Sequence, residues 1–226
     1  MKKVLVVVTN VSKYENADVP TGLWLGEAVH FVDVMEKAGY TIDYVSPKGG
    51  YTPIDPHSLE KDFMGPVDWK YYTDMSFMNK LGNTLSADSI NPDDYEVIYY
   101  TGGHGVIWDF PNDTNLQGIS RKIYENGGIV SAVCHGLGGL LNIKLSNGKN
   151  LIDGIKLTGF SNSEEKAVGL DKLVPYLTET ELKNRGANYV KGADWSEFSV
   201  SDNRVITGQN PASGATVARE VLKVLK

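Results

Sequence analysis

The sequence contains a single cysteine, Cys134, among its 226 residues. No disulfide can therefore form within the chain, and neither an intramolecular dithiol cycle nor a zinc site built from several cysteines is available to it. Proteins of reducing compartments typically lack disulfides. We therefore predict a cytoplasmic protein.

Long apolar runs and clusters of basic residues are also missing. The first apolar run ends at Thr9, which is too short for a signal peptide and far below the roughly 18 residues of a membrane span. Lysine and arginine number 22 against 28 aspartates and glutamates, which gives a net charge of -6. This balance gives no reason to expect a nucleic acid or an anionic membrane as a partner.

Histidine is scarce, with four residues in the chain: His30, His57, His104 and His135. None belongs to an HExxH pattern, so the sequence gives no support for a metal site. The glycine-rich segment 102–105 is not followed by the Gly-Lys-Ser/Thr of a phosphate-binding loop. We therefore predict neither a metal nor a cofactor.

Strand-like and helix-like segments alternate along the chain. Near-continuous Val/Leu runs, as at Lys3–Thr9, are typical of strands covered on both faces. Helical spacing over Leu23–Ala38, closed by Gly39, predicts the first helix. Further strands are expected at 41–45, 96–100, 129–133 and 156–158, and a hairpin at 198–207. Further helices are expected at 115–126 and at 213–225. A short helix is also expected to follow a capping box at 178–181. This alternation predicts an α/β fold, with a mostly parallel sheet and helices on both faces.

We expect one domain over residues 1–226, with short helices forming an insertion at about 59–93, where the sequence is polar and aromatic with weak periodicity. In open parallel sheets, sites lie beyond the carboxyl ends of the strands. Three informative segments are expected there: the glycines from Gly102, the turn at Cys134, and the loop after Phe160.

Cys134 follows the strand at 129–133, and small residues stand two positions before it (Ala132) and two positions after it (Gly136). This spacing is typical of a nucleophile elbow, in which small neighbours permit a strained strand-to-helix turn. A helix that begins at the turn would lower the pKa of the thiol and favour the thiolate. We predict a nucleophile at Cys134, and the alternative is a buried structural cysteine.

Several residues could assist this thiol. His135 would act as a general base or acid, or else cap the turn. Glu27 lies on the first helix between small residues that permit close packing, although an ordinary solvated glutamate explains the same position. Glu164 and Glu165 follow the segment 158–162, and either could orient a histidine or simply begin a charged helix.

The segment 101–105 offers backbone N–H groups directly after a strand. Such groups suit an oxyanion hole or an anion cradle. Gly103 and His104 are therefore the candidates for binding an oxyanion or the substrate. The glycines alone are a weak signal, because many loops are rich in glycine.

Five segments occur in a recognisable order: Gly26-Glu27, the stretch 101–105, Ala132 to Gly136, Thr158-Gly159-Phe160 with Glu164-Glu165, and the stretch 207–213. Together they resemble the ThiJ/PfpI superfamily, and within it the branch of heat-shock-protein-31-like, glutathione-independent glyoxalases. The resemblance covers essentially the whole chain. It implies a flavodoxin-like three-layer sandwich of the kind found in class I glutamine amidotransferases.

The resemblance also implies roles for the triad. Cys134 would be the nucleophile and His135 the triad histidine. The third member would be an acidic residue, for which Glu165 matches best by spacing, with Glu164 as the alternative.

For the remaining groups, the resemblance implies Glu27 as the proton-handling partner of the sulfur and Gly103 as an oxyanion donor. The implied activity is conversion of methylglyoxal, a small 2-oxoaldehyde, to D-lactate without glutathione. Thiolate addition gives a hemithioacetal, a proton then moves between the two substrate carbons, and water hydrolyses the resulting thioester. No redox cofactor is consumed.

Other enzymes share these parts. A glutaminase of the class I amidotransferase type usually has a late His-x-Glu motif, and no histidine follows His135, so that triad cannot be assembled. A cysteine amidase or peptidase stays open, because acyl transfer uses the same groups. Relatives have also been assigned deglycase activity, which the sequence does not separate from glyoxalase activity.

Two non-enzymatic functions are the rivals. A thiol redox sensor would use the reactivity of Cys134. A holdase chaperone needs exposed apolar surface, for which the aromatic residues Trp69, Tyr71, Tyr72 and Phe77 are candidates, although core packing or a subunit interface explains them more simply. Relatives are often dimers, so the resemblance also suggests a homodimer.

Overall fold

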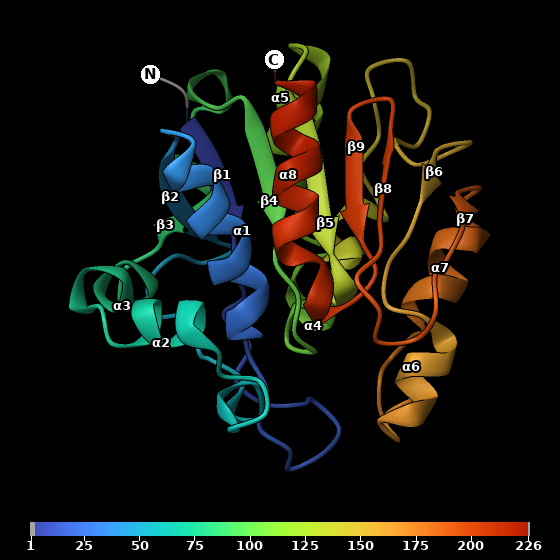
Figure 1. Ribbon diagram of the computed structural model, residues 1–226. Coiled ribbons are helices and arrows are strands. Elements are labelled where there is room, and N and C mark those ends of the chain that lie inside the picture. The colour runs from blue at the N-terminus through green and yellow to red at the C-terminus, as the bar shows by residue number, and fades with distance from the viewer. Residues whose placement is uncertain (1–2, 226) are drawn as a thin grey trace.

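A seven-stranded sheet forms the centre of the molecule, shown by a computed structural model that describes residues 3–225 (Figure 1). The strand order is β3-β2-β1-β4-β5-β9-β8. The strands are β1 (Lys3–Val7), β2 (Thr41–Ser46), β3 (Leu85–Ser86), β4 (Val97–Tyr100), β5 (Ile129–Val133), β8 (Ser199–Asp202) and β9 (Val205–Gly208). Neighbouring strands are parallel except for β8 and β9, which confirms the predicted mostly parallel sheet.

Helices cover both faces of this sheet. They are α1 (Leu25–Lys37), α2 (Pro66–Tyr72), α3 (Met75–Gly82), α4 (Val106–Asp109), α5 (Thr114–Glu125), α6 (Asn162–Ala167), α7 (Thr178–Asn184) and α8 (Gly214–Val224). Val4 and Val6 of β1 face the core under α1 and α8, whereas Leu5 and Val7 face the core under α5. Side chains of a strand alternate between the two faces, so a continuous apolar run fills both cores. The predicted three-layer sandwich is confirmed.

Several element boundaries agree with the sequence patterns. Helix α1 falls within the predicted range, and Gly39 behind it has a φ of 88°, as a left-handed helix terminator requires. Strand β5 spans Ile129–Val133 as predicted. The predicted hairpin is β8 and β9, whose turn residues Asn203 and Arg204 both have positive φ values.

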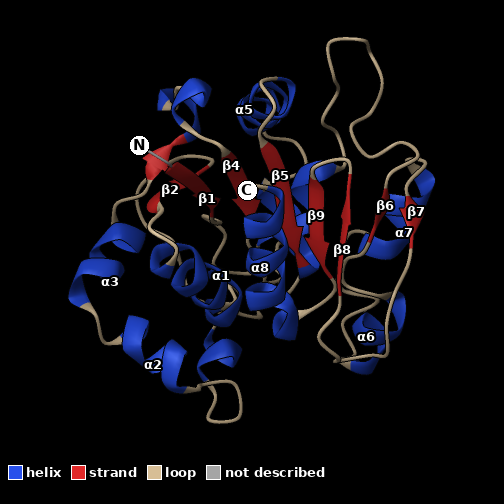
Figure 2. Cartoon of the chain, turned by 45° about the horizontal axis from the view of Figure 1, so that its top comes forward, coloured by secondary structure: helices blue, strands red, loops and turns tan. Residues whose placement is uncertain are grey.

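At the far edge of the sheet, one prediction is confirmed and another is wrong. The strand predicted at 156–158 is β6 (Lys156–Leu157), which pairs with β7 (Asn188–Tyr189) in a separate two-stranded sheet beside β8 (Figure 2). Thr178 does not cap α7, because it lies inside the helix and the capping residue, Leu177, offers no side-chain acceptor. The capping box belongs instead to α6, between Ser161 and Glu164.

The stretch 59–93 contains α2 and α3, followed by the short strand β3 and two short 3-10 helices, Ala87–Ser89 and Pro92–Asp94. Strand β3 extends the main sheet beyond β2, so the end of this stretch is part of the sheet. Among residues 3–225, no helix combines the length and the apolar character needed to cross a bilayer.

Candidate active site

The carboxyl ends of three neighbouring strands meet at one edge of the sheet. Tyr100 of β4 pairs with Ala132 of β5, and Val133 of β5 pairs with Gly208 of β9. The glycine segment after β4 and the turn at Cys134 therefore lie next to each other. Helices α4 and α6 lie at the same edge (Figure 1).

Cys134 stands on a sharp, strained turn. It has a φ of 57°, a left-handed conformation that side chains other than glycine rarely adopt. A 3-10 helix, η4 (Cys134–Leu140), follows at once. A Cβ on Gly136 would lie 2.5 Å from the carbonyl oxygen of Tyr100, so the residue two positions after the cysteine must be small. This geometry is the strained strand-to-helix turn that the small-x-Cys-x-small spacing predicts.

The thiol, an imidazole and a carboxylate form one chain. Cys134 Sγ lies 3.3 Å from His135 Nδ1, and His135 Nε2 lies 2.5 Å from Glu165 Oε2. A carboxylate can only accept, so the proton between them is assigned to Nε2. His135 Nδ1 is then free to accept the thiol proton. The main-chain N–H of Phe160 also donates to the Cys134 carbonyl at 3.3 Å, which ties the glutamate's segment to the elbow.

Glu165 binds a second imidazole. His104 Nε2 lies 2.6 Å from Glu165 Oε1, and the rings of His104 and His135 lie 4.0 Å apart. Burial alone would raise the pKa of Glu165, but the charges and hydrogen bonds of His135 and His104 outweigh it and lower the pKa. Burial lowers the pKa of His135, and the neighbouring His104 lowers it further. A neutral imidazole, able to act as a base, is therefore favoured in the resting protein.

The ligand atoms of His104, His135 and Glu165 lie within 4.8 Å of one another, as the ligands of a single cation would. Two imidazoles and one carboxylate are suitable ligands for a transition metal. The hydrogen bonds just described already account for the arrangement. The predicted role of His104 in binding an oxyanion or substrate stays a prediction, and its observed partner is Glu165.

Glu27 reaches the thiol from α1. Its side chain is fully buried, so the solvated alternative for this residue is wrong. The carboxyl oxygens make no hydrogen bond of ordinary geometry to residues 3–225. Burial raises the pKa of Glu27 to about 8, although close contacts with the Cys134 side chain and the Gly102 backbone act against this rise. A carboxyl group of this kind can both donate and accept a proton near neutral pH.

The predicted low pKa of the thiol is wrong for the resting protein. Burial raises the pKa of Cys134 well above its ordinary value, and the nearby Glu27 carboxyl adds to this effect. A hydrogen bond from the His135 backbone acts in the opposite direction but is weaker. The thiol therefore keeps its proton until a base removes it, and both Glu27 and His135 are in reach.

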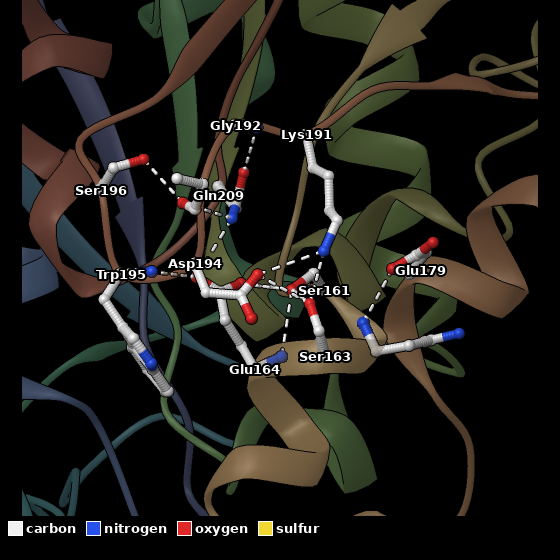
Figure 3. Close-up of polar contacts among 12 residues, drawn as sticks. Ser161, Ser163, Glu164, Glu179, Lys191, Gly192, Asp194, Trp195, Ser196 and Gln209 are labelled. Carbon is white, nitrogen blue, oxygen red and sulfur yellow. Dashed lines mark hydrogen bonds and ion pairs between the residues drawn. The ribbon is translucent and has the colours of Figure 1, made fainter.

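Glu164 faces away from the triad. Its Oε2 accepts hydrogen bonds from Ser161 N at 3.0 Å and Ser161 Oγ at 2.7 Å, which closes the capping box of α6. Its Oε1 binds the loop around Trp195 and the turn after β9 (Figure 3). Of the two candidates for the third triad member, Glu165 alone contacts the imidazole, and Glu164 holds the surrounding loops.

Gly103 has a φ of 102°, and a Cβ there would collide with the backbone of Gly22. No hydrogen bond uses the Gly103 N–H within the described part of the chain. The group thus remains available as the predicted oxyanion donor.

Two aromatic residues near the triad were not singled out as site residues in the sequence. Phe160 contacts the His135 ring at 4.3 Å, and Trp195 meets Phe160 edge-on at 5.8 Å. Phe160 could have been found from its place directly after the Thr158-Gly159 segment. Trp195 lies between the strands β7 and β8, and no periodicity points to it.

Comparison with known proteins agrees with this architecture. The DJ-1/PfpI family model matches residues 21–224. The chain is 35% identical to the glutathione-independent glyoxalase HSP31 of Saccharomyces cerevisiae, covering 100% of this chain and 98% of that protein. It is 34% identical to glyoxalase 3 of Candida albicans, covering 98% of each.

Two solved structures are similar over nearly their whole length. The Rapid Encystment Protein of 24 kDa from Francisella tularensis superimposes with a TM-score of 0.96 at 38% identity, covering 100% of both chains. Glyoxalase III from Candida albicans gives a TM-score of 0.92 at 32% identity, covering 99% of this chain and 97% of that one. The protein described here therefore belongs to the DJ-1/PfpI family.

Proposed function

We propose that this protein is a glutathione-independent glyoxalase that converts methylglyoxal to D-lactate through Cys134, in detoxification or stress response. The full-length similarity to named glyoxalases supports the reaction class. The observation that carries the proposal is the position of Glu27, a buried carboxyl with a pKa near 8, beside the only thiol of the chain. An isomerisation between two adjacent carbons requires such a group, because it must take a proton from one carbon and return it to the other.

The first step is addition of the thiol to the aldehyde carbon. The sulfur forms a bond to that carbon, and His135 or Glu27 takes the thiol proton. The aldehyde oxygen becomes an oxyanion, for which the N–H groups of Gly103 and of the backbone after Cys134 are the nearest candidates. Protonation of that oxygen gives a hemithioacetal on Cys134.

The second step moves a proton between carbons. Glu27 removes the proton from the former aldehyde carbon, the electron pair forms a double bond to the ketone carbon, and the ketone oxygen takes up a proton to give an enediol. Return of a proton to the second carbon, with loss of the proton from the first oxygen, leaves a lactoyl thioester on Cys134. Oxidation at one carbon balances reduction at the other, so no external oxidant or reductant is needed.

The last step is hydrolysis of the thioester. His135 Nδ1 removes a proton from water, and the hydroxide attacks the thioester carbon. Lactate leaves as the sulfur takes back a proton. Glu165, 2.5 Å from Nε2, stabilises the imidazolium that forms in this step.

The proposal is tested by lactate formation from methylglyoxal in the absence of glutathione. The wild-type protein should release lactate, and Cys134→Ala should release none, with both proteins folded by circular dichroism. Absence of turnover in folded wild-type protein would contradict the proposal and favour the deglycase, amidase or holdase alternatives.

The substrate is thus a small 2-oxoaldehyde, acted on in the cytoplasm. A cysteine amidase or peptidase is the second candidate, because the chain from Cys134 through His135 to Glu165 also suits acyl transfer. Hydrolysis of a chromogenic amide, with no lactate formed, would favour it. We keep the single domain over 1–226, the insertion at about 59–93 and the homodimer as proposals.

The aromatic residues of the stretch 59–93 do not form the continuous exposed patch that a holdase needs, because two of them are buried. Tyr71 and Phe77 are buried, with 4% exposure each, whereas Trp69 is 50% exposed. The buried pair packs ring against ring at 5.1 Å, which is core packing. If holdase action were the main function, Cys134→Ser would leave the suppression of client aggregation intact.

A further inference from the structure

Trp195 has an unusual backbone and an unusual exposure. It lies in the loop between β7 and β8, and its φ of 63° is left-handed. A bulky residue rarely takes this conformation, because its Cβ crowds the backbone. The residue is also 47% exposed, so burial of the indole does little to offset the strain. Outliers of this kind gather at functional sites.

A buried carboxylate fixes the loop in place. Glu164 Oε1 accepts a hydrogen bond from the Trp195 N–H at 2.9 Å (Figure 3). The same oxygen accepts from Gln209 Nε2 at 3.1 Å and from Asn210 Nδ2 at 2.9 Å. Asn210 Nδ2 also donates to the Ser196 carbonyl at 2.8 Å. The backbone before Trp195 is therefore anchored directly to the buried Glu164 carboxylate, and the backbone after it is anchored through Asn210, which also bonds to Glu164.

The indole is the outer end of a row of rings that leads to the triad. Its centroid lies 5.8 Å from that of Phe160, edge to face. Phe160 is only 3% exposed and contacts the His135 ring at 4.3 Å. The row thus runs from solvent, through a buried phenyl ring, to the imidazole that faces Cys134.

We infer that Trp195 forms the outer wall of the substrate site and selects 2-oxoaldehydes that carry a flat aromatic substituent. The inference rests on the proposed function. The aldehyde carbon must reach Cys134 Sγ, so the two carbonyl groups lie beside His135. The inference places a methyl substituent beside His135 and a ring-sized substituent alongside Phe160 and the indole. Aromatic pairing between substituent and indole then adds affinity.

The test compares methylglyoxal with phenylglyoxal in the wild type, Trp195→Gly and Trp195→Phe. Glycine adopts the left-handed conformation without strain, so Trp195→Gly removes the ring and keeps the loop. We expect it to lower kcat/KM for phenylglyoxal by about tenfold, mainly through KM, and to change that for methylglyoxal by less than about threefold. Trp195→Phe should recover most of the loss. Trp69→Ala, which removes a tryptophan of similar exposure from α2, is the matched control and should change neither value.

The outcomes separate cleanly. An equal fall for both substrates in Trp195→Gly would overturn the inference, since the ring would then only support Phe160 and His135. Unchanged values for both substrates would overturn it as well. If the wild-type protein turns over neither substrate, the proposed function itself is wrong. Thermal melting of each variant identifies any loss of folding.

Discussion

The carboxyl group of Glu27 occupies the space that a side chain at Gly102 would need. A Cβ built on Gly102 overlaps Glu27 Oε2 and lies 3.0 Å from Cys134 Cβ. The missing side chain at position 102 is therefore what allows α1 to deliver a carboxyl group to the thiol. The Tyr99 hydroxyl adds a second constraint, because it donates to the Glu27 carbonyl at 2.7 Å and holds that turn of the helix.

Gly102→Ala should displace Glu27 and remove most of the activity. A shift of about 1 Å in a catalytic group costs on the order of a hundredfold in rate. Overpacking should also lower the free energy of unfolding by about 1–3 kcal/mol. The control is Gly118→Ala on α5, where a Cβ meets open space and alanine should keep the activity and raise stability by up to about 1 kcal/mol. An active Gly102→Ala would show that the carboxyl position is not critical.

The stability of the fold should depend on pH through Glu27. Burial raises its pKa from the ordinary value of 4.5 to about 8. Between these values the folded protein holds a proton that the unfolded chain releases, so this group lowers stability as pH rises through that window. The effect of one such group is at most about 1.4 kcal/mol per pH unit. The side chain in Glu27→Gln is neutral at every pH. Urea unfolding should therefore show that the free energy of unfolding of this variant rises relative to that of the wild type from pH 5 to pH 8. An equal difference at both pH values would argue against a raised pKa.

Substitutions of Glu164 and of Glu165 should have different effects on activity. Glu165→Gln removes the carboxylate that fixes the His135 tautomer and should lower kcat by about a hundredfold or more. It should also lower stability, because the lowered pKa of Glu165 shows that folding favours its ionised form. Glu164→Gln places an amide donor among groups that donate to Glu164, and should cost about 1–3 kcal/mol of stability. Steady-state kinetics and urea unfolding of both variants check this pair. A hundredfold loss of kcat in Glu164→Gln, with kcat kept in Glu165→Gln, would identify Glu164 as the triad member.

His104 should tune the titration of His135. Its presence lowers the pKa of His135, so His104→Gln, which keeps a neutral donor for Glu165, should raise that pKa. The base is active when neutral, so the acid limb of the kcat/KM profile should move to higher pH. The midpoint of that limb is the readout, and it does not depend on the absolute rate. An unmoved midpoint would mean that His104 does not act on His135 through charge.

Local sequence patterns predict the sheet and the elbow well. Strand β5 reads as an apolar run and Cys134 follows it directly, so both the strand and the turn depend on neighbours in the chain. The distinction between Glu164 and Glu165 was also within reach. Ser161 and Glu164 stand in the Ser-x-x-Glu spacing of a capping box, which commits Glu164 to the helix start and leaves Glu165 for the imidazole.

Features set by distant contacts escape this kind of prediction. Glu27 is buried because Gly102, far along the chain, leaves room for it. The pairing of β6 with β7 is set by contacts between distant segments. A strand of two residues carries too little sequence pattern to show which strand it pairs with. The strained backbone of Trp195 is held by Glu164, which lies on another element. The sequence near position 195 therefore does not predict this conformation.

The central claim is that Glu27 carries the proton between the substrate carbons while Cys134 holds the substrate. The measurement that tests it most directly is D-lactate formation from methylglyoxal without glutathione by wild type and Glu27→Gln, with thiol titration to confirm that Cys134 is intact. We predict D-lactate from the wild type and a rate at least about a hundredfold lower in Glu27→Gln. D-lactate formed by Glu27→Gln at the wild-type rate would contradict the account.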